Sequence, residues 1–343
     1  MASVQLSVVL PNYQHARLIT RALDALLAQQ RRPDEIVIVD DGSTDDSVAV
    51  IERVAARTPG IRLLVNTSNR GAIASLKRGL DASQGRYVYL AAADDWVMPH
   101  FFSLAVEALE AHPKAGLFCG DSVLVDATSN RTLGLRPPVM PLSRAGFVDP
   151  AATGRLLARS DNWILTGSAV FRRTAIAEAG GLDEELGSFA DGYLARKVSL
   201  MCGFYYAPQV VAAWSVHPSG LSRSAALDPE RAGRLLILVT RKIAEDPVFP
   251  PWYVQRFSDR WRFATARLAL EASPRNNAAV LALGARSDVD RTVLGVASRL
   301  PGRHLAGLAM LAWLWLRFRP YRLVDLLRTA VLRRRPLARA LPN

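Results

Sequence analysis

The chain has 343 residues, of which half are hydrophobic and 22% are charged. This length allows one large domain or two ordinary ones, and the composition excludes disordered, collagen-like and disulfide-rich proteins. The two cysteines, Cys119 and Cys202, lie far apart in apolar surroundings, which favours buried free thiols in a reducing compartment.

The net charge of +12 is concentrated in the last third of the chain. Residues 1–230 contain 22 Lys and Arg against 24 Asp and Glu, whereas residues 231–343 contain 21 against 7. This asymmetry predicts two parts with different roles, which we place at 1–225 and 226–343. The N-terminus leads directly into an apolar run, so no signal peptide is expected, and no stretch has the ~18–20 apolar residues that span a bilayer.

The first 125 residues alternate between strand and helix patterns. Strand-like runs occupy 6–10, 35–39, 61–65 and 87–91. Helix-like segments occupy 17–30, 46–56 and 71–83. Strands separated by helices of this length predict βαβ crossovers, and therefore an α/β fold with a mostly parallel sheet.

The pattern weakens after residue 126. Residues 127–160 contain several prolines and are expected to form a long loop. Further strands are expected at 164–171 and 204–207, with helices at 173–179 and 192–201 between them. From Pro229 onward the pattern is helical.

Adjacent carboxylates follow two of the predicted strands. Asp40 and Asp41 come directly after the run at 35–39, and Asp94 and Asp95 come shortly after the run at 87–91. Ligands of open parallel sheets bind where strands end, and a hard divalent cation stabilises carboxylates that would otherwise repel each other. The pattern therefore predicts a cation and phosphate site at this edge of the sheet. For Asp40 and Asp41 alone, a helix N-cap and turn is an equally good interpretation.

Six sequence blocks resemble the family 2 glycosyltransferases with the GT-A fold, in the order expected for that family. They cover about two thirds of the chain, and the block Val39-Asp-Asp-Gly-Ser43 is specific even by itself. The blocks are 7–13, 36–45, 69–71, 92–95, 180–185 followed closely by 190–191, and 214–222. The resemblance implies a Rossmann-like GT-A domain with flanking helices, followed by a basic and mainly helical C-terminal region.

The resemblance also implies a role for each block. The residues expected to bind the nucleotide-sugar are Pro11, Asn12, Tyr13, Asp40, Asp41, Arg70, Gly71, Lys77 and Asp94. A Mn²⁺ or Mg²⁺ ion that bridges the diphosphate is expected on Asp94, Asp95 and His217. Asp191 corresponds to the general base, which takes a proton from the acceptor hydroxyl in an inverting displacement.

Two positions depart from the family pattern. Ala92 replaces an acid of the metal motif, and Ala190 replaces an acid that commonly precedes the base. Without that neighbouring charge, the pKa of Asp191 is expected to be lower. Both departures leave an inactive homologue as an alternative.

Several candidates also have a plain structural interpretation. On a helix of this kind, solvated cations are the commoner explanation of residues such as Arg70 and Lys77. His217 is equally well explained as a histidine on the surface or behind the ligands. Trp96 and Trp163 can border an acceptor sugar or pack in the core. Gly42 and Gly71 are expected to serve backbone turns and not a phosphate cradle.

The basic C-terminal third contains two apolar helical segments. Residues 305–316 are apolar throughout but rise only ~18 Å as a helix, short of the ~30 Å of a bilayer core. The second segment places Leu323, Leu326, Leu327, Ala330 and Val331 on one face and ends in 333–335, all arginine.

Aromatic residues beside arginines predict how this region is used. Trp313, Trp315 and Tyr321 suit helices that lie in the headgroup layer of an anionic membrane. The alternative is that these helices pack on the catalytic domain or on a second copy of the chain, which would form a homo-oligomer. No nucleic-acid motif is present, so no nucleic-acid partner is expected.

We hypothesise a cytoplasmic hexosyl- or hexosaminyltransferase, peripheral on the inner face of the cell membrane. It would move a sugar from a UDP-sugar, the donor favoured by the resemblance, to a saccharide or polyprenyl-linked saccharide in bacterial cell-surface polysaccharide synthesis. One alternative is a catalytically weak or inactive scaffold of the same fold in a membrane-bound polysaccharide-assembly complex. A nucleotidyltransferase is disfavoured, because no early glycine-rich loop with Arg and Lys is present.

Overall fold

The computed structural model describes residues 5–160, 163–164, 166–217, 220, 224, 226–272 and 277–333. By its contacts the chain divides into two units. The first unit takes in the chain up to Leu156, the segment 162–216 and the part from Leu327 onward. The second takes in 157–161 and 217–326.

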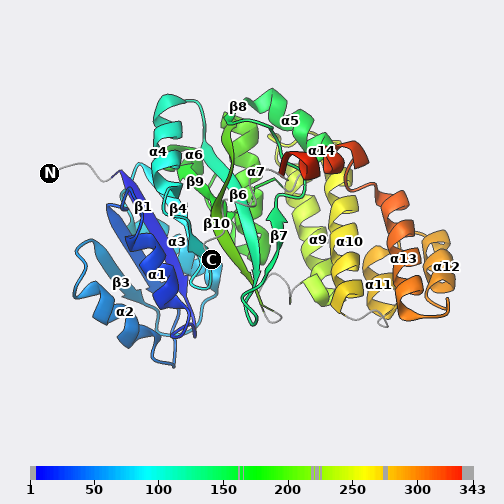
Figure 1. Ribbon diagram of the computed structural model, residues 1–343, viewed down its shortest axis with the longest axis horizontal. Coiled ribbons are helices and arrows are strands. Elements are labelled where there is room, and N and C mark those ends of the chain that lie inside the picture. The colour runs from blue at the N-terminus through cyan, green and yellow to red at the C-terminus, as the bar shows by residue number, and fades with distance from the viewer. Residues whose placement is uncertain are drawn as a thin grey trace. The chain divides into compact units, whose positions relative to one another are not determined.

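The first unit contains a ten-stranded sheet with flanking helices (Figure 1). Its strands are β1 (Leu6–Asn12), β2 (Glu35–Asp40), β3 (Ile61–Val65), β4 (Tyr87–Leu90), β5 (Trp96–Val97), β6 (Leu117–Asp126), β7 (Thr132–Arg136), β8 (Gly146–Val148), β9 (Ala169–Arg172) and β10 (Phe204–Val216). Its helices are α1 (Ile19–Leu27), α2 (Ser47–Ala55), α3 (Ala72–Ala82), α4 (Phe101–Ala111), α6 (Arg173–Glu178), α7 (Ala190–Cys202) and the larger part of α5 (Pro150–Arg159), whose last residues belong to the second unit. Two 3₁₀ turns, η1 (Thr166–Ser168) and η2 (Glu184–Phe189), precede β9 and α7.

The sheet has the order β3-β2-β1-β4-β9-β6-β10-β5. The first four strands are parallel, and β9 joins them to the parallel pair β6 and β10 by running antiparallel to both β4 and β6. The α/β class and the four early strands expected from the sequence are confirmed. β1 and β2 run side by side to Asn12 and Asp40, so their carboxyl ends meet at one edge of the sheet.

The expectation of a long loop at 127–160 is wrong, because this segment contains β7, β8 and α5. The prolines Pro137, Pro138 and Pro141 lie between β7 and β8, so they mark the connection only. β7 pairs antiparallel with β6, and β8 with β10. β10 also extends beyond its predicted end, because its pairing with β6 continues past an irregularity next to Pro208 to Val216.

Helices cover both faces of the sheet. Ile19 and Leu23 of α1, Ile51 of α2 and the Phe101–Phe102 pair of α4 form one core with the strand residues that point to that face. The other face receives α3, which approaches so closely that a Cβ on Gly79 would lie 2.5 Å from Val9 Cγ1. Glycine at this position permits that approach.

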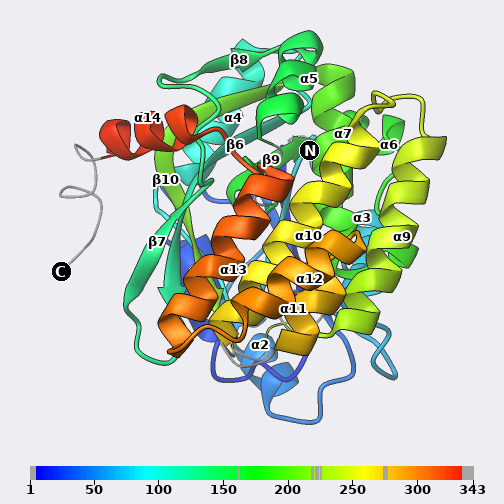
Figure 2. The same ribbon diagram turned by 90° about the vertical axis from the view of Figure 1, so that its right-hand side faces the viewer.

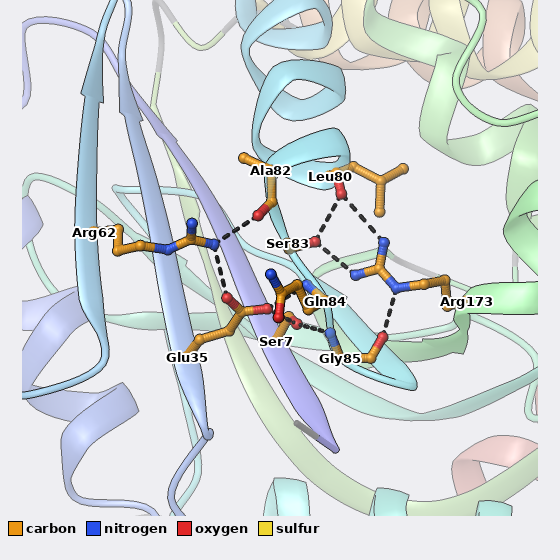
Figure 3. Close-up of polar contacts among 9 residues, drawn as sticks. All are labelled: Ser7, Glu35, Arg62, Leu80, Ala82, Ser83, Gln84, Gly85 and Arg173. Carbon is orange, nitrogen blue, oxygen red and sulfur yellow. Dashed lines mark hydrogen bonds and ion pairs between the residues drawn. The ribbon is translucent and has the colours of Figure 1, made fainter. Parts of the chain in front are cut away.

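A polar network, buried at Ser7 and Glu35 and half-exposed at Arg62, joins the amino ends of β1, β2 and β3 (Figure 3). The Glu35 carboxylate accepts hydrogen bonds from Ser7 Oγ at 2.6 Å and from the Gln84 amide, and Arg62 Nη2 lies 2.8 Å from it. Burial alone would raise the pKa of Glu35, but these hydrogen bonds and the Arg62 charge together lower it. Arg173 closes the network by donating to the Gly85 carbonyl (2.6 Å) and to Ser83 Oγ (2.6 Å).

The second unit is helical, as the sequence predicts (Figure 2). It contains α9 (Pro229–Glu245), α10 (Tyr253–Ala272), α11 (Asn277–Gly284), α12 (Asp288–Ala297), α13 (Arg303–Phe318) and the first residues of α14 (Leu323–Arg333). Asp228 caps α9 ahead of its N-terminal proline, and Ser287 forms a capping box with Asp290 on α12. No helix among the described residues is long and apolar enough to cross a membrane.

Candidate functional site

Asp40 organises the turn that follows β2. Its carboxylate accepts hydrogen bonds from Asn12 Nδ2 at 2.7 Å, from the Ser43 amide at 2.8 Å and from Ser43 Oγ at 2.7 Å. Asp40 is fully buried. These contacts agree with the interpretation of Asp40 as a carboxylate that stabilises a turn, which was one of the two interpretations of the sequence. A direct contact of Asp40 with a nucleotide stays a prediction.

Asp41 holds the loop that follows β3. It accepts hydrogen bonds from Asn66 Nδ2 (2.6 Å), the Arg70 amide (2.9 Å) and the Gly71 amide (2.8 Å). Gly71 has a φ of +95°, which favours glycine, so its role in a backbone turn is confirmed. The Arg70 side chain is exposed at this edge.

The loops after β1 and β2 are joined by hydrogen bonds. The Gln14 amide donates to Ser43 Oγ at 3.0 Å, its side chain donates to Thr44 Oγ1 at 2.7 Å, and its Oε1 accepts from the Asp45 amide at 3.1 Å. Gln14 has a φ of +57°, and its neighbour Tyr13 is exposed. These hydrogen bonds join the two loops into one rim, and the Tyr13 ring is exposed on it.

Asn12 carries a buried acceptor that no described group uses. Its Nδ2 binds Asp40 and lies 3.4 Å from Ser43 Oγ, but its Oδ1 has no hydrogen-bond partner in the described part of the chain. A buried polar atom without a partner is costly, so this oxygen suits an N–H or O–H donor of a ligand. Pro11 precedes it within β1, opposite Val39 of β2.

Asp94 and Asp95 lie between β4 and β5 and are tied to β10. The Ser215 amide donates to Asp95 Oδ1 at 2.7 Å, and Ser215 Oγ donates to the Asp94 carbonyl at 2.6 Å. Arg21 of α1 also donates to that carbonyl at 3.0 Å, and its guanidinium stacks 3.9 Å from the centre of the Trp96 ring. The contact of Trp96 with Arg21 favours the packing interpretation of this side chain.

The chemistry of this carboxylate pair fits a divalent cation. Burial and the charge of Asp94 raise the pKa of Asp95 well above its usual range, although the Ser215 amide and Arg21 act in the opposite direction. A bound cation would favour the ionised form of both carboxylates.

The protein ligands of such a cation are few. No three His, Cys, Asp or Glu side chains gather into a metal site within the described ranges. A cation held by Asp94 and Asp95 would thus need water or substrate phosphate as further ligands, which is common for Mg²⁺. His217 follows β10 directly but belongs to the second unit, so its part in the site stays a prediction.

Asp191 lies in the first turn of α7. Thr166 Oγ1 donates a hydrogen bond to Asp191 Oδ2, and the Gly192 amide donates to Oδ1 at 2.6 Å. Burial raises the pKa of Asp191, and the hydrogen bonds from Thr166 and Gly192 offset part of that rise. The lower pKa expected from Ala190 is therefore not found, because burial outweighs the missing neighbouring charge.

The turn η1 lies next to both Asp95 and Asp191. Thr166 binds Asp191, and a Cβ on the next residue, Gly167, would lie 3.6 Å from Asp95 Oδ2. Tyr89 of β4 fixes the turn by donating to the Gly167 carbonyl at 3.0 Å. Asp95 and Asp191, separated by about a hundred residues in sequence, therefore both lie next to one three-residue turn.

Two other candidates have the contacts that their structural interpretations predict. Lys77 is half-exposed on α3 and pairs with Glu184 at 3.3 Å, as a solvated cation would. Trp163 is buried and its ring centre lies 5.7 Å from that of Phe204, so its core role is confirmed. Cys119 is buried and Cys202 half-buried, and both are free thiols.

Four residues that build the candidate site were not predicted from the sequence: Gln14, Arg21, Thr166 and Ser215. Their roles depend on contacts with distant segments, and the one local signal was the Thr166-Gly-Ser168 triplet ahead of a strand. Small polar residues at such a strand entry are common in turns, which made the signal weak.

A sequence model of the family described as "Glycosyl transferase family 2" matches residues 7–173. The match includes both carboxylate pairs and η1. This part of the chain belongs to glycosyl transferase family 2. The match confirms the resemblance to family 2 glycosyltransferases that the sequence blocks indicated. Asp191 lies beyond the matched residues.

Curated relatives agree with this family. The chain is 35% identical over 114 residues to an uncharacterized glycosyltransferase of Nostoc sp., which is 33% of this chain and 35% of that protein. It is 26% identical over 229 residues to the succinoglycan biosynthesis protein ExoO of Rhizobium meliloti, which is 64% and 63% of the two chains. The chain thus spans about a third of the first relative and less than two thirds of the second.

Solved structures share the GT-A fold. S. aureus TarS 1–349 in complex with UDP-GlcNAc has a TM-score of 0.61 at 15% identity, over 90% of this chain and 91% of that one. The mannosyltransferase PcManGT of Pyrobaculum calidifontis, in complex with GDP-Man and Mn²⁺, has a TM-score of 0.56 at 22% identity, over 96% and 87%. At these identities the likeness is one of fold.

Proposed function

We propose that this protein is a metal-dependent, inverting glycosyltransferase that uses a nucleoside-diphosphate sugar, with a UDP-sugar as the favoured donor. The observation that carries the proposal is that Asp95 and Asp191 both lie next to η1, where Thr166 binds Asp191 and Gly167 neighbours Asp95. One carboxylate suits the donor diphosphate with its cation, and the other suits the acceptor hydroxyl. A single displacement needs both groups next to the same anomeric carbon.

The donor would lie against the rim formed by the loops after β1 and β2. Asn12 Oδ1 would accept from an N–H of the base, and the exposed Tyr13 ring would pack on it. Asp40 and Asp41 would act mainly by holding the loops, because their oxygens already accept hydrogen bonds from those loops. Arg70, exposed beside the Asp41-bound loop, would meet the phosphates.

Asp94 and Asp95 would hold a Mn²⁺ or Mg²⁺ ion. When bound, such an ion neutralises the charge that develops on the departing nucleoside diphosphate. Ser215 and Arg21 would keep the segment in place, since both donate to the Asp94 carbonyl. Ser215 also donates to Asp95 through its amide.

Asp191 would act as the general base. It would remove the proton from an acceptor hydroxyl while that oxygen bonds to the anomeric carbon and the bond from that carbon to the diphosphate breaks. Attack from the face opposite the leaving group inverts the configuration. A pKa raised by burial makes the carboxylate a stronger base than an exposed aspartate, which favours this role.

The biological setting follows from the relatives and from the charge of the chain. ExoO is named for succinoglycan biosynthesis, which supports a saccharide or lipid-linked saccharide acceptor in cell-surface polysaccharide synthesis. The basic C-terminal third supports a peripheral position on an anionic membrane at the cytoplasmic side.

A non-catalytic scaffold of the same fold is the second candidate. It is favoured by Ala92 and Ala190, which replace two acids of the family pattern. Such a scaffold would retain the sheet and lose sugar transfer.

Asp191→Asn separates the two candidates. With a mixture of UDP-sugars and lipid-linked acceptors, the wild type should release UDP, and Asp191→Asn should lose nearly all release while still binding UDP. The control Asp24→Asn, at an exposed carboxylate of α1, should keep wild-type activity. Full activity of Asp191→Asn would contradict the assignment of the base, and an inactive wild type that binds no nucleotide would favour the scaffold.

A further inference from the structure

Helix α14 is held by its polar side chains. Asp325 forms an ion pair with Arg159 at its first turn. Thr329 Oγ1 accepts a hydrogen bond from the Met140 amide at 3.1 Å in its middle. At its end, Arg333 donates twice to Asp121 Oδ2, at 2.8 Å and 3.2 Å. The polar side of this helix thus faces the protein.

The apolar side of α14 faces away from the protein. Leu323, Val324, Leu327 and Val331 are each between 58% and 75% exposed. Their spacing places them on one side of a helix, so they form a continuous aliphatic face. This arrangement is the reverse of the usual one, in which an amphipathic helix buries its apolar residues. A face of this kind indicates a partner outside the chain.

The aromatic residues that the sequence analysis singled out have a different role. Trp313 is half-buried and donates its Nε1 proton to Asp290 at 3.2 Å. Trp315 packs edge-on against Phe263, with ring centres 5.7 Å apart. These side chains stabilise the core of the second unit, so the expectation that they form the membrane contact is weakened. The exposed aliphatic face of α14 takes that place.

The positive charge next to the aliphatic face of α14 indicates what kind of partner binds there. Residues 303–333 contain six arginines and one acidic residue, Asp325, which is bound to Arg159. Arg319, Arg322 and Arg328 are exposed on and next to α14. A second copy of the chain would bring the same positive charge to the contact, whereas an anionic bilayer brings the opposite charge.

We propose that α14 docks the protein on the surface of an anionic lipid bilayer. The helix lies parallel to the membrane with its four aliphatic side chains below the headgroups, and the arginines bind lipid phosphates. Asp121 and Arg159 hold the helix in this orientation through Arg333 and Asp325. This assignment names the element that gives the proposed enzyme its membrane position, and its test does not depend on sugar transfer.

Sedimentation of the full chain with vesicles tests the proposal. The wild type should bind phosphatidylcholine vesicles that contain phosphatidylglycerol, and bind pure phosphatidylcholine vesicles much less. The triple variant Leu323→Gln, Leu327→Gln, Val331→Gln should bind the anionic vesicles more than about tenfold less tightly. Because all three positions are exposed, the variant should fold normally, which its urea unfolding curve checks.

The control is a double variant, Val289→Gln with Val296→Gln, on α12. These two valines are as exposed as the three residues replaced on α14. This control should bind as the wild type does. The proposal is overturned if the wild type ignores anionic vesicles, or if the triple variant binds them unchanged. If the wild type ignores vesicles and is a dimer that the triple variant converts to a monomer, the face is a contact between copies. UDP binding on the same samples reports on the proposed function separately.

Discussion

Gly42 lies in the turn after β2, and its replacement by alanine measures how tightly the loops of the site interlock. Its φ is +76°, and an added Cβ would lie 3.0 Å from the backbone Cα and carbonyl carbon of Ser68. The left-handed conformation costs a non-glycine residue about 1–2 kcal/mol. A contact this close to backbone forces the 66–71 loop to move, which adds about 1–2 kcal/mol. Gly42→Ala should therefore lower the free energy of unfolding by about 2–4 kcal/mol.

The matched control is Gly181→Ala, because Gly181 has the same φ of +76° and no atom within 4 Å of an added Cβ. It should lose only the conformational part, about 1–2 kcal/mol. Equilibrium urea unfolding of both variants gives the difference. Gly42→Ala should also bind UDP more weakly, since the displaced loop carries Arg70 and Gly71. Equal stability losses in the two variants would refute the interlocked-loop account.

Three further predictions concern the network at Glu35, the base and the packing of α3. Because the pKa of Glu35 is lowered in the fold, its carboxylate stabilises the protein above the ordinary value of 4.5, and this stabilisation is lost as the pH falls. The difference in unfolding free energy between wild type and Glu35→Gln should thus shrink below pH 4.5, and a constant difference would argue against a charged network. Because burial raises the pKa of Asp191, the acidic limb of the pH profile of kcat/KM should lie above pH 3.8. Thr166→Val removes a hydrogen bond that lowers this pKa, so it should move the limb to higher pH. A limb that does not move would belong to another group. Gly79→Ala should destabilise the protein by about 1–3 kcal/mol, because the added Cβ would contact Val9. The control Gly154→Ala on α5 has open space around the added Cβ and should not destabilise it. Equal effects of the two substitutions would contradict the close packing of α3.

The early strands and helices were predictable because each carries its own pattern. β2 is entirely buried, so its sequence is a continuous apolar run that ends at a carboxylate, and α1 shows one apolar face. The strand β7 had no such pattern. It forms because β6 offers a free edge, and its own residues are mostly polar or small. Pairing across the sheet decided its structure, and local sequence could not show this.

The same distinction holds for the site. Asp41 and Asp191 could be named as candidates from the sequence because each belongs to a local motif. The hydrogen bond from Thr166 to Asp191 and the stacking of Arg21 on Trp96 join segments that are far apart in sequence, and no spacing announces them. For α14, the sequence identified the apolar face, but the contacts of Asp325, Thr329 and Arg333 with distant segments revealed which side faces the protein.

Asp94 and Asp95 are proposed to form a nucleotide-sugar site with a divalent cation. Calorimetric titration of UDP, GDP and dTDP, each with and without Mn²⁺, tests it most directly on the wild type, on Asp94→Ala and on the control Asp24→Asn. The account predicts that one nucleotide binds only with Mn²⁺, that Asp94→Ala abolishes this binding and that Asp24→Asn retains it. Failure of a folded wild type to bind any of the three, or unchanged binding by Asp94→Ala, would contradict it.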